Sequence, residues 1–406
     1  MFKINIRKKI YSNMIDKEKI KLCAKNIVNA INIQRKGENI LVKGGTYSQD
    51  LLEEIALNVY RNNGIPVIIS NSDNYINTMY QDTSISSEIL EITPLHYLKL
   101  IENIDAYIVI EPYEDPGILG NAPREKLNAK IKFNAPLKDI LYGGKPEYAP
   151  GKKWCYAGWP SMKAAKYYNI EYELLEKFIV GGMSVPQDKM DEITINLGKF
   201  FENAKNVHVS DDLGTDFTVT IQDRPMILDN GLLSDERISV GLLGGNLPAG
   251  EVFFPPHEKI GEGTLFCPLT RDRMTNKIIK NTHLRFKEGK LLIDEVTSEE
   301  NQSDLINTFK ESEKIDREKN LPELRTYNVA ELGIGCNPEI TKAIGYILTD
   351  EKINGSVHLA FGSNKMMGGT SVSQVHWDFV TAPQANITVE YKNGTKKQIM
   401  EKGILV

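Results

Sequence analysis

Residues 38–70, ENILVKGGTYSQDLLEEIALNVYRNNGIPVIIS, decide the fold of the first part of the chain. Glu38–Lys43 has the composition of a largely buried strand, and the turn Gly44-Gly45-Thr46 follows it. Gln49–Asn62 spaces its apolar residues as an amphipathic helix does. A glycine and a proline then lead into a second buried strand, Val67–Ser70. This order of strand, helix and strand predicts a crossover unit, which favours a parallel sheet.

The same alternation surrounds this unit. Helices are predicted over residues 20–31, 97–103 and 124–130, and a strand over 106–111. Residues 142–160 read as a segment of aromatics and turns. We therefore expect an N-terminal α/β domain with a parallel sheet, covering residues 1–185.

After residue 185 the pattern changes. A proline-led helix is predicted over residues 186–203, and residues 207–209 and 216–221 alternate as antiparallel strands do. Glycine-punctuated strands follow, interrupted by a charged helix over 303–318. We expect residues 186–406 to form an α+β C-terminal domain.

The bulk composition is that of a globular protein. The chain has 406 residues, which suggests two or three domains, with 41% hydrophobic and 25% charged residues. A net charge of −5 gives no general attraction to nucleic acid. No stretch approaches the roughly 20 apolar residues that span a bilayer. We therefore expect neither a nucleic-acid nor a membrane partner.

Two further features bear on location. The basic start, with Lys3, Arg7, Lys8 and Lys9, is not followed by an apolar run of signal-peptide length, so we expect no secretory signal. The cysteines are scattered and form no CxxC pair; they are Cys23, Cys155, Cys267 and Cys336. Scattered cysteines of this kind are expected to be reduced and buried, as in a cytoplasmic protein.

The Gly44-Gly45 turn stands where a phosphate loop would stand in a nucleotide-binding protein. It lacks both G-x-G-x-x-G and a following G-K-[ST]. A simple tight turn is the interpretation that we adopt.

Four strand-like segments in the C-terminal part carry polar residues that do not suit a plain core. They are NLPAGEVFF with Glu251, NVAELGIG with Glu331, SVHLAFG with His358, and QVHWDFV with His376 and Asp378. Because strand side chains alternate between faces, each segment has one hydrophobic face and one face with a potential ligand. Isolated carboxylates among apolar residues are costly to bury unless they are paired or bind a metal.

Each of these residues also has an ordinary structural interpretation. A single strand glutamate is usually exposed to solvent, and a single strand histidine is usually a hydrogen-bonded core residue. The combination is more informative, because two histidines and three carboxylates occur in one domain. Among the other histidines only His257, after Pro255-Pro256, lies near such a segment, and it is a candidate for a binding cleft.

Mixed imidazole and carboxylate ligands suit Zn, Co, Mn or Fe. Three carboxylates exceed what one catalytic zinc ion normally uses, which favours two ions that share a bridging carboxylate. Such two-metal sites activate water for hydrolysis.

The segments NLPAGEVF, AELGIG, HLAFG and HWDF resemble, in this order, those of the aminopeptidase T and aminopeptidase S family of metallopeptidases. The resemblance implies two divalent ions, removal of N-terminal residues from peptide substrates, and a homodimer. It assigns as metal ligands Glu251, Glu331, His358, His376 and Asp378. Glu331 would be the bridging, catalytic carboxylate, with Glu251 and His376 expected toward one ion and His358 and Asp378 toward the other.

The chain departs from this family at one position. Members carry a tyrosine seven residues after the first histidine, and Lys365 stands there in this sequence. Lys365 could replace that tyrosine as a catalytic group that stabilises an oxyanion, or it could be a solvated loop lysine. Tyr327 or Tyr346 could instead supply the hydroxyl group.

Two questions about the substrate stay open. Asp216 and Glu258 are both candidates for recognition of a substrate's α-amine. A ring-cleaving 2,5-dihydroxypyridine dioxygenase with a single Fe(II) shares the family's ancestry and is an alternative function, and a specialised peptide-processing or non-catalytic relative is another. Retention of Glu331 beside Glu251 favours the two-metal peptidase.

Overall fold

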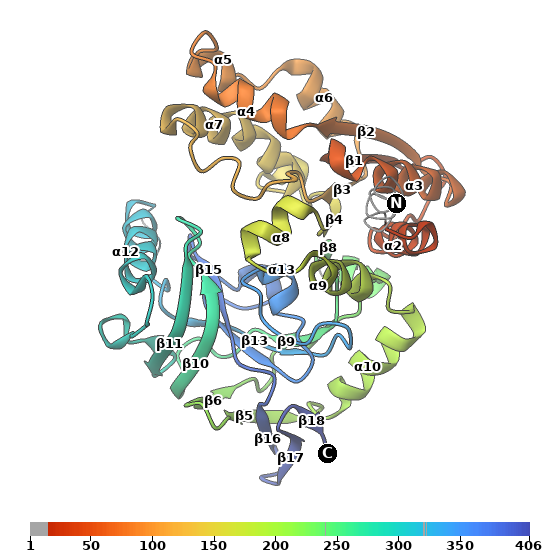
Figure 1. The fold of residues 1–406 in the computed structure, drawn as a ribbon. Helices are drawn as coiled ribbons and strands as arrows, with labels where there is room; N and C mark the ends of the chain where they lie inside the picture. The colour runs from red at the N-terminus through yellow and green to blue at the C-terminus, as the bar shows by residue number, and fades with distance from the viewer. Residues whose placement is uncertain (1–14, 240, 320, 322) are drawn as a thin grey trace, which may run out of the picture. The chain divides into compact units, whose positions relative to one another are not determined.

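The computed structural model describes residues 15–239, 241–319, 321 and 323–406, so the basic segment 3–9 lies outside the described residues. The chain forms two compact units (Figure 1). The first comprises the chain up to Ser184 together with Leu232–Leu247, and the second comprises Val185–Gly231 and Pro248–Val406. The segment Leu232–Leu247 thus belongs with the first unit, although the sequence pattern groups it with the C-terminal part.

The first unit is built on a parallel sheet in the order β2-β1-β3-β4-β8. Its strands are β1 (Asn39–Gly45), β2 (Ile65–Asn71), β3 (Ala106–Ile110), β4 (Lys153–Ala157) and β8 (Gly244–Leu247). Its helices are α2 (Lys17–Asn29), α3 (Gln49–Arg61), α4 (Asp73–Gln81), α5 (Ser87–Leu90), α6 (Leu95–Asn103), α7 (Arg124–Leu141), α8 (Met162–Tyr168), α9 (Tyr172–Glu176) and α11 (Asp235–Ser239). The α/β fold class predicted for this part of the chain is confirmed.

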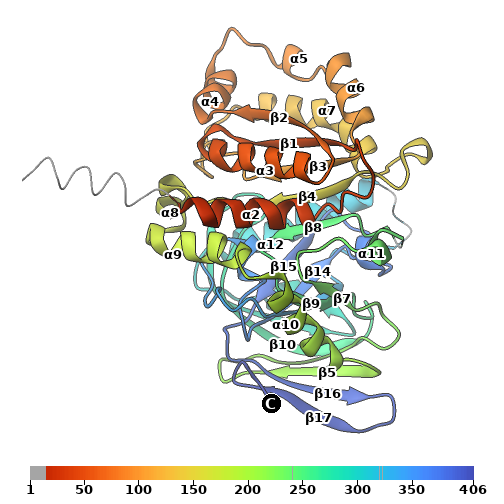
Figure 2. The same cartoon turned by 90° about the vertical axis from the view of Figure 1, so that its right-hand side faces the viewer.

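Helices cover both faces of this sheet because its strands are apolar on both sides. Leu41 and Tyr107 pack with residues of α6 and α7 on one face, and α3 packs against β1 and β2 on the other. Figure 2 shows α3 in front of the sheet and α7 behind it. The predicted crossover β1-α3-β2 is therefore present, with parallel pairing in register from Asn39 opposite Ile65.

Three elements of this unit differ from the expectations. The segment 142–160 contains a central strand, β4, which was expected to be turns. α7 runs on to Leu141 through an internal proline, Pro136, and is therefore longer than predicted. β8 was not recognised because it begins with Gly244-Gly245, yet a Cβ on Gly244 would lie 2.1 Å from the carbonyl oxygen of Trp154. Glycine is required there for the close approach of the two strands.

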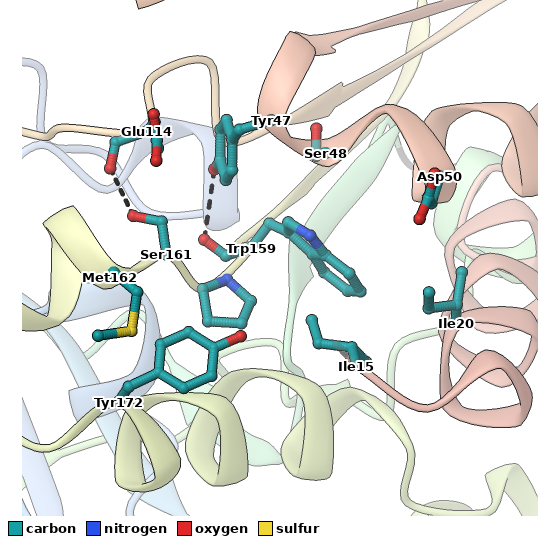
Figure 3. Close-up of a pocket in the computed structure, with 11 residues that line it drawn as sticks. Ile15, Ile20, Tyr47, Ser48, Asp50, Glu114, Trp159, Ser161, Met162 and Tyr172 are labelled. Carbon is teal, nitrogen blue, oxygen red and sulfur yellow. Dashed lines mark hydrogen bonds between the residues drawn. The ribbon is translucent and has the colours of Figure 1, made fainter. Parts of the chain in front are cut away.

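A cavity of ≈ 250 Å³ lies at the carboxyl ends of β1, β3 and β4 (Figure 3). Tyr47 and Ser48 follow β1, Glu114 follows β3, and Trp159 follows β4. Glu114 and Asp50 are among the residues that line it, and the Glu114 carboxylate is paired with Lys163 at 2.8 Å. The turn predicted at Gly44-Gly45-Thr46 is wrong in position: both glycines end β1, paired with Ser70 and Asn71 of β2. A 3-10 turn, Thr46–Ser48, leads into α3, and there the Ser48 hydroxyl donates to the Gly45 carbonyl at 2.8 Å.

The second unit consists of two antiparallel sheets. The first has the order β12-β11-β10-β6-β5-β16-β17-β18, and the second has the order β15-β14-β13-β9-β7. The strands of the larger sheet are β5 (Ala204–Ser210), β6 (Asp216–Thr220), β10 (Gly261–Arg271), β11 (Ile278–Lys287), β12 (Lys290–Leu291), β16 (Asn386–Tyr391), β17 (Lys396–Glu401) and β18 (Ile404–Leu405). Those of the smaller sheet are β7 (Ile227–Asp229), β9 (Glu251–Phe254), β13 (Val329–Gly335), β14 (Val357–Gly362) and β15 (His376–Val380).

The inner faces of both sheets share one core. Phe217 and Leu265 of the larger sheet lie in the same buried cluster as Leu332, Leu359 and Phe379 of the smaller one. The helices of this unit are α10 (Gln187–Lys199), α12 (Gln302–Glu318) and α13 (Ile347–Asp350). The predicted sheet-rich C-terminal part is confirmed, including the antiparallel pair of β5 and β6 and the inserted helix α12.

All four cysteines are buried, as expected, and no disulfide bond links them. Among the described residues, none of the helices combines the length and the apolar character required to cross a membrane.

Candidate metal centre

The five ligand candidates lie on adjacent strands of the smaller sheet of the second unit. Glu251 begins β9, Glu331 lies on β13, His358 on β14, and His376 and Asp378 on β15. The strand order β15-β14-β13-β9 brings together residues that are up to 127 positions apart in sequence. They share the face of the sheet opposite the core cluster, because the intervening residues, such as Leu332 and Leu359, point into the core.

Small residues lie opposite the ligands in the strand register. In the strand register, Gly333 faces His358, Gly335 faces Glu251, Gly362 faces His376, and Ala360 faces both Glu331 and Asp378. At Gly333 the contact is with a ligand itself, since a Cβ there would lie 2.0 Å from Nε2 of His358. The imidazole therefore lies directly over the backbone of β13, which only a glycine permits. This explains Gly333 of AELGIG. At Gly335, and at Gly362 of HLAFG, an added Cβ would instead meet a backbone carbonyl oxygen, that of Ile353 at 2.3 Å and that of Val375 at 2.0 Å.

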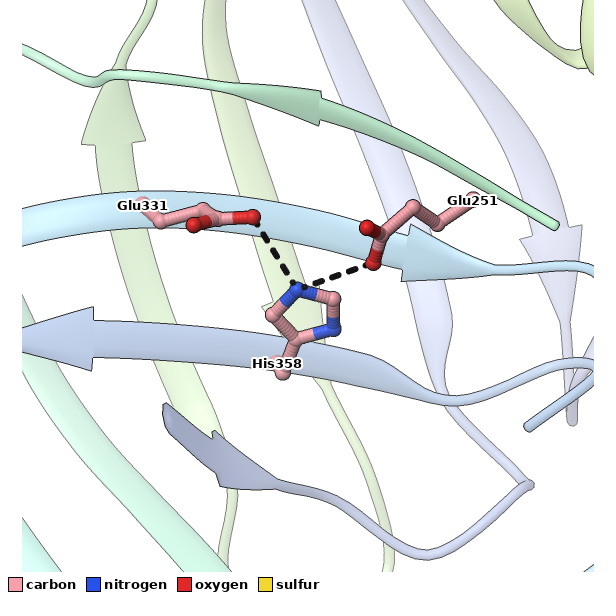
Figure 4. A group of neighbouring side chains, drawn as sticks. All are labelled: Glu251, Glu331 and His358. Atoms are coloured by element: carbon pink, nitrogen blue, oxygen red, sulfur yellow. Dashed lines mark hydrogen bonds and ion pairs between the residues drawn. The ribbon is translucent and has the colours of Figure 1, made fainter. Parts of the chain in front are cut away.

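The five side chains form two groups that share Glu331. One group is Glu251, Glu331 and His358, shown in Figure 4, and the other is Glu331, His376 and Asp378. The two oxygens of Glu331 face different histidines: Oε1 lies 3.4 Å from Nε2 of His358, and Oε2 lies 3.2 Å from Nε2 of His376. The second contacts are His358 Nε2 to Glu251 Oε2 at 3.4 Å and His376 Nε2 to Asp378 Oδ1 at 3.2 Å.

This grouping contradicts the expected division of the ligands between two ions. Glu251 lies with His358, and His376 lies with Asp378, whereas the opposite combination was expected. The reason is the strand order. His376 and Asp378 both lie on β15, at the end of the sheet away from β9, so neither can approach Glu251 as closely as His358 does.

The spacing of these atoms fits ligands of a common ion better than hydrogen bonds. Charge-assisted N–H···O bonds are usually about 2.7–2.9 Å long. Two ligand atoms that each lie about 2.1 Å from one tetrahedral ion are about 3.4 Å apart. The observed 3.2–3.4 Å matches the second value. In addition, Glu251 Oε2 and Asp378 Oδ1 are buried and form no hydrogen bond within the described part of the chain.

The electrostatics of the cluster require positive charge at its centre. Burial raises the pKa of Glu251 to about 7, although nearby cations oppose this. Burial also disfavours the charged form of His358, but the neighbouring carboxylates raise its pKa to about 9. For Asp378, burial opposes ionisation and the adjacent His376 outweighs it, so its pKa is lowered. Protons on the imidazoles thus offset the buried carboxylates where no cation does so, and divalent ions would displace them.

A hydrogen bond to the following loop fixes the orientation of His376. Its Nδ1 lies 2.7 Å from the carbonyl oxygen of Ser363 and donates to it, which leaves Nε2 directed at Glu331 and Asp378. An outer hydrogen bond of this kind fixes the tautomer of a metal-binding histidine.

The loop that carries Ser363 is held by buried Glu258. One Glu258 oxygen accepts from Asn364 Nδ2 and the backbone N–H of Thr370, at 3.1 and 2.6 Å. The other oxygen lies 2.5 Å from Arg224 and 3.8 Å from Arg325. These donors lower the pKa of Glu258 to about 2, against the effect of burial. Glu258 is thus a structural anchor, and its predicted availability to a substrate amine is not supported.

The other candidates are placed outside the cluster. Lys365 is exposed in a short 3-10 helix, Lys365–Met367, two residues beyond Ser363. His257 bonds through Nε2 to the Gln222 carbonyl at 2.8 Å, and the Asp216 carboxylate lies 2.8 Å from His208 Nε2. The Tyr327 hydroxyl donates to Glu313 at 2.9 Å. Tyr346 is half-buried and directly precedes α13.

Sequence reasoning missed two residues beside the cluster. Lys352 is buried and its Nζ lies 2.5 Å from Glu251 Oε1. Glu351 Oε2 lies 3.3 Å from the same ammonium, and burial together with nearby Asp378 raises the pKa of Glu351 to about 8. The only local signal in the sequence is the charged pair itself, seven and six residues before His358, in a segment that otherwise reads as a turn.

Comparison with solved structures shows the fold. The chain is similar to wild-type AmpT from Thermus thermophilus, with a TM-score of 0.72 and 17% identity over 96% of this chain and 99% of that chain. It is also similar to 2,5-dihydroxypyridine dioxygenase from Pseudomonas putida KT2440, with a TM-score of 0.54 and 13% identity over 97% of this chain and 98% of that chain. A search of curated protein sequences found no match.

Comparison with protein families gives a more specific result. The family model described as thermophilic metalloprotease (M29) matches residues 16–404, which include both units and every residue of the cluster. A metalloprotease requires a divalent metal, and the two groups around Glu331 offer imidazole and carboxylate ligands to one. The chain therefore belongs to the thermophilic metalloprotease (M29) family, whose members are hydrolases.

Proposed function

We propose that this protein is an aminopeptidase of the aminopeptidase T and S type that uses two divalent ions bridged by Glu331. The proposal rests on the position of Glu331, which belongs to both ligand groups and whose two oxygens face two different histidines. Membership in a metalloprotease family supports the hydrolytic chemistry.

In addition to the shared Glu331, each ion would have two ligands that do not bind the other ion. Glu251 and His358 would hold one ion, and His376 and Asp378 the other. Bound divalent ions would lower the pKa of a water ligand and polarise the carbonyl group of the scissile peptide bond. Zn, Co and Mn all suit this ligand set.

The chain's own residues would supply orientation and charge. The Ser363 carbonyl keeps the Nε2 atom of His376 directed at the cluster. We assign to Lys365 the stabilisation of the developing oxyanion, because it stands at the family's tyrosine position, in the loop whose Ser363 carbonyl orients His376. Tyr327 is not assigned this role, since its hydroxyl donates to Glu313.

The experiment combines metal analysis with a peptide assay. Protein purified without chelator should contain two Zn, Co or Mn ions per chain, and it should release amino acids from the N-terminus of short peptides in a chelator-sensitive manner. One iron per chain with oxygen uptake and no amino-acid release would refute the peptidase proposal in favour of a ring-cleaving dioxygenase. Two ions without release would leave a metal-binding relative that has lost peptidase activity.

We also propose that the protein is a homodimer, on the basis of the family resemblance, and that it is cytoplasmic, on the basis of its scattered, buried cysteines. Light scattering coupled to size-exclusion chromatography would test the dimer. A mass near 45.7 kDa, that of one chain, would contradict it.

A further inference from the structure

Lys352 is a buried cation among carboxylates, next to the metal centre. Its side chain is 2% exposed, and its Nζ lies 2.5 Å from Glu251 Oε1, 3.3 Å from Glu351 Oε2 and 3.8 Å from Asp229 Oδ2. Burying an ammonium group is strongly unfavourable unless its partners are close and well placed. The side chain is therefore held by these carboxylates, and its position has an electrostatic cause.

Backbone hydrogen bonds fix the main chain of Lys352, from which its side chain extends. The N–H of Lys352 donates to the Thr349 carbonyl at 3.0 Å, and the Lys352 carbonyl accepts from the N–H of Asn337, also at 3.0 Å. Asn337 follows β13, the strand of Glu331, and Lys352 precedes β14, the strand of His358. The backbone of Lys352 is thus hydrogen-bonded to the segment that follows β13, which limits where its ammonium can lie.

Because of the bond to Lys352, the two oxygens of Glu251 make different contacts. Oε1 accepts from the ammonium at 2.5 Å. Oε2 has no hydrogen-bond partner among the described residues and lies 3.4 Å from His358 Nε2, a contact that Figure 4 marks with a dashed line. A carboxylate anchored through one oxygen presents the other as a single ligand atom in a fixed direction. Outer-shell partners orient metal ligands in this way.

We propose that Lys352 is a positioning residue of the metal centre, which holds Glu251 so that one oxygen alone is directed at the ion bound with His358. This inference rests on the proposed metal site and deepens it, because it assigns the support of one ligand to a residue that is itself no ligand. Lys352 also offsets the mutual repulsion of the three carboxylates around it, so that they can be buried together.

Replacement of Lys352 by methionine distinguishes a positioning role from a purely electrostatic one, because the two predict opposite changes in the affinity for a divalent ion. Removal of a positive charge near a cation site would by itself strengthen the binding of a divalent ion. Loss of the support for Glu251 would weaken it. We expect Lys352→Met to weaken Zn²⁺ binding about 10- to 100-fold. The measurement is a competition titration with a chromophoric chelator at fixed pH, which does not depend on activity.

A second pair of variants keeps the test valid if Lys352→Met folds poorly. Asp229→Asn removes a carboxylate that lies beside Lys352 but belongs to neither ligand group. The double variant Asp229→Asn/Lys352→Met then has the same local charge as the wild type. We expect it to bind Zn²⁺ at least tenfold more weakly than Asp229→Asn alone. Equal or tighter binding in the double variant would overturn the proposal.

Two controls complete the design. Lys126→Met removes another buried lysine, in the first unit, whose Nζ donates to the Asp82 carbonyl at 2.6 Å, and it should leave Zn²⁺ affinity unchanged. In Lys352→Ala, added ethylamine should restore part of the lost affinity, because it can replace the missing ammonium. If the wild type itself binds no divalent ion, the proposed function fails; if it binds and the Lys352 variants bind equally well, only the role of Lys352 fails.

Discussion

Replacement of Glu331 by glutamine tests the metal centre most directly. Glu331 is the only residue common to both ligand groups among the described residues. Without its carboxylate, Glu251 and His358 would remain at one position and His376 and Asp378 at the other. Two protein ligands are fewer than the three that catalytic zinc sites normally use. We therefore expect Glu331→Gln to lose both ions.

The expected size of the effect follows from binding linkage. At an ion concentration one hundred times the dissociation constant, the binding of a single ion stabilises the folded protein by about 2.7 kcal/mol, which is the minimum expected here. For a unit of roughly 200 residues, such as the second one, this corresponds to an increase in melting temperature of roughly 5–11 °C. A thousandfold loss of affinity would reduce the stabilisation to less than about 0.1 kcal/mol. The variant should then show no measurable shift at the same ion concentration.

The assay is thermal unfolding with chelator and with added Zn²⁺, together with metal analysis of the dialysed protein. The wild type should show the shift and contain two ions per chain. Glu313→Gln is the matched control, since Glu313 lies on α12, bonds to Tyr327 and belongs to neither ligand group. It should keep both the shift and the ions. A full shift in Glu331→Gln would refute the bridging role, whatever the activity of the variant.

Three further predictions concern the surroundings of the centre. The pKa of Glu258 is lowered to about 2, so its ionised form stabilises the folded state above the ordinary pKa of about 4.5, and this contribution is lost as pH falls from 4.5 to 2. In urea unfolding of the wild type, the free energy of unfolding should therefore fall by on the order of 3 kcal/mol over this pH range, and Glu258→Gln should not show this fall. An equal pH dependence in both proteins would contradict the anchor role. Gly333→Ala should displace the His358 imidazole, because the added Cβ would lie 2.0 Å from Nε2, and a titration should show much weaker metal binding with unchanged circular dichroism. Lys365→Met should lower kcat on short peptides about 100-fold while both ions stay bound, if Lys365 stabilises the oxyanion; unchanged kcat would identify a solvated loop lysine.

Local pattern was sufficient to predict the elements with strong apolar periodicity, but not others such as α4, β10, β11 and β16. The crossover of residues 38–70, the antiparallel pair β5 and β6, and helix α12 each follow from apolar periodicity within a few residues. The predictions failed where periodicity is weak. β4 lies among aromatics and turns, and β8 begins with two glycines that are explained only by the close approach of Trp154.

The residue types of the candidate centre were also evident from the sequence. A strand places alternate side chains on one face, so His376 and Asp378 had to point the same way, and a polar face had to oppose a hydrophobic one. What spacing could not provide is the order of strands that are far apart in the chain. The order β15-β14-β13-β9 decides that Glu251 meets His358 and that Glu331 lies between the two histidines.

The sequence by itself determined the set of five ligand candidates, because ligand type and strand alternation are local properties. Only the tertiary structure decided how these residues divide around Glu331, that Glu258 serves as an anchor, and that Lys352 contacts Glu251 across 101 positions of sequence. The physical reason is that burial and charge pairing depend on every element packed around a group. A lysine in a turn-like segment looks exposed until the fold surrounds it with three carboxylates.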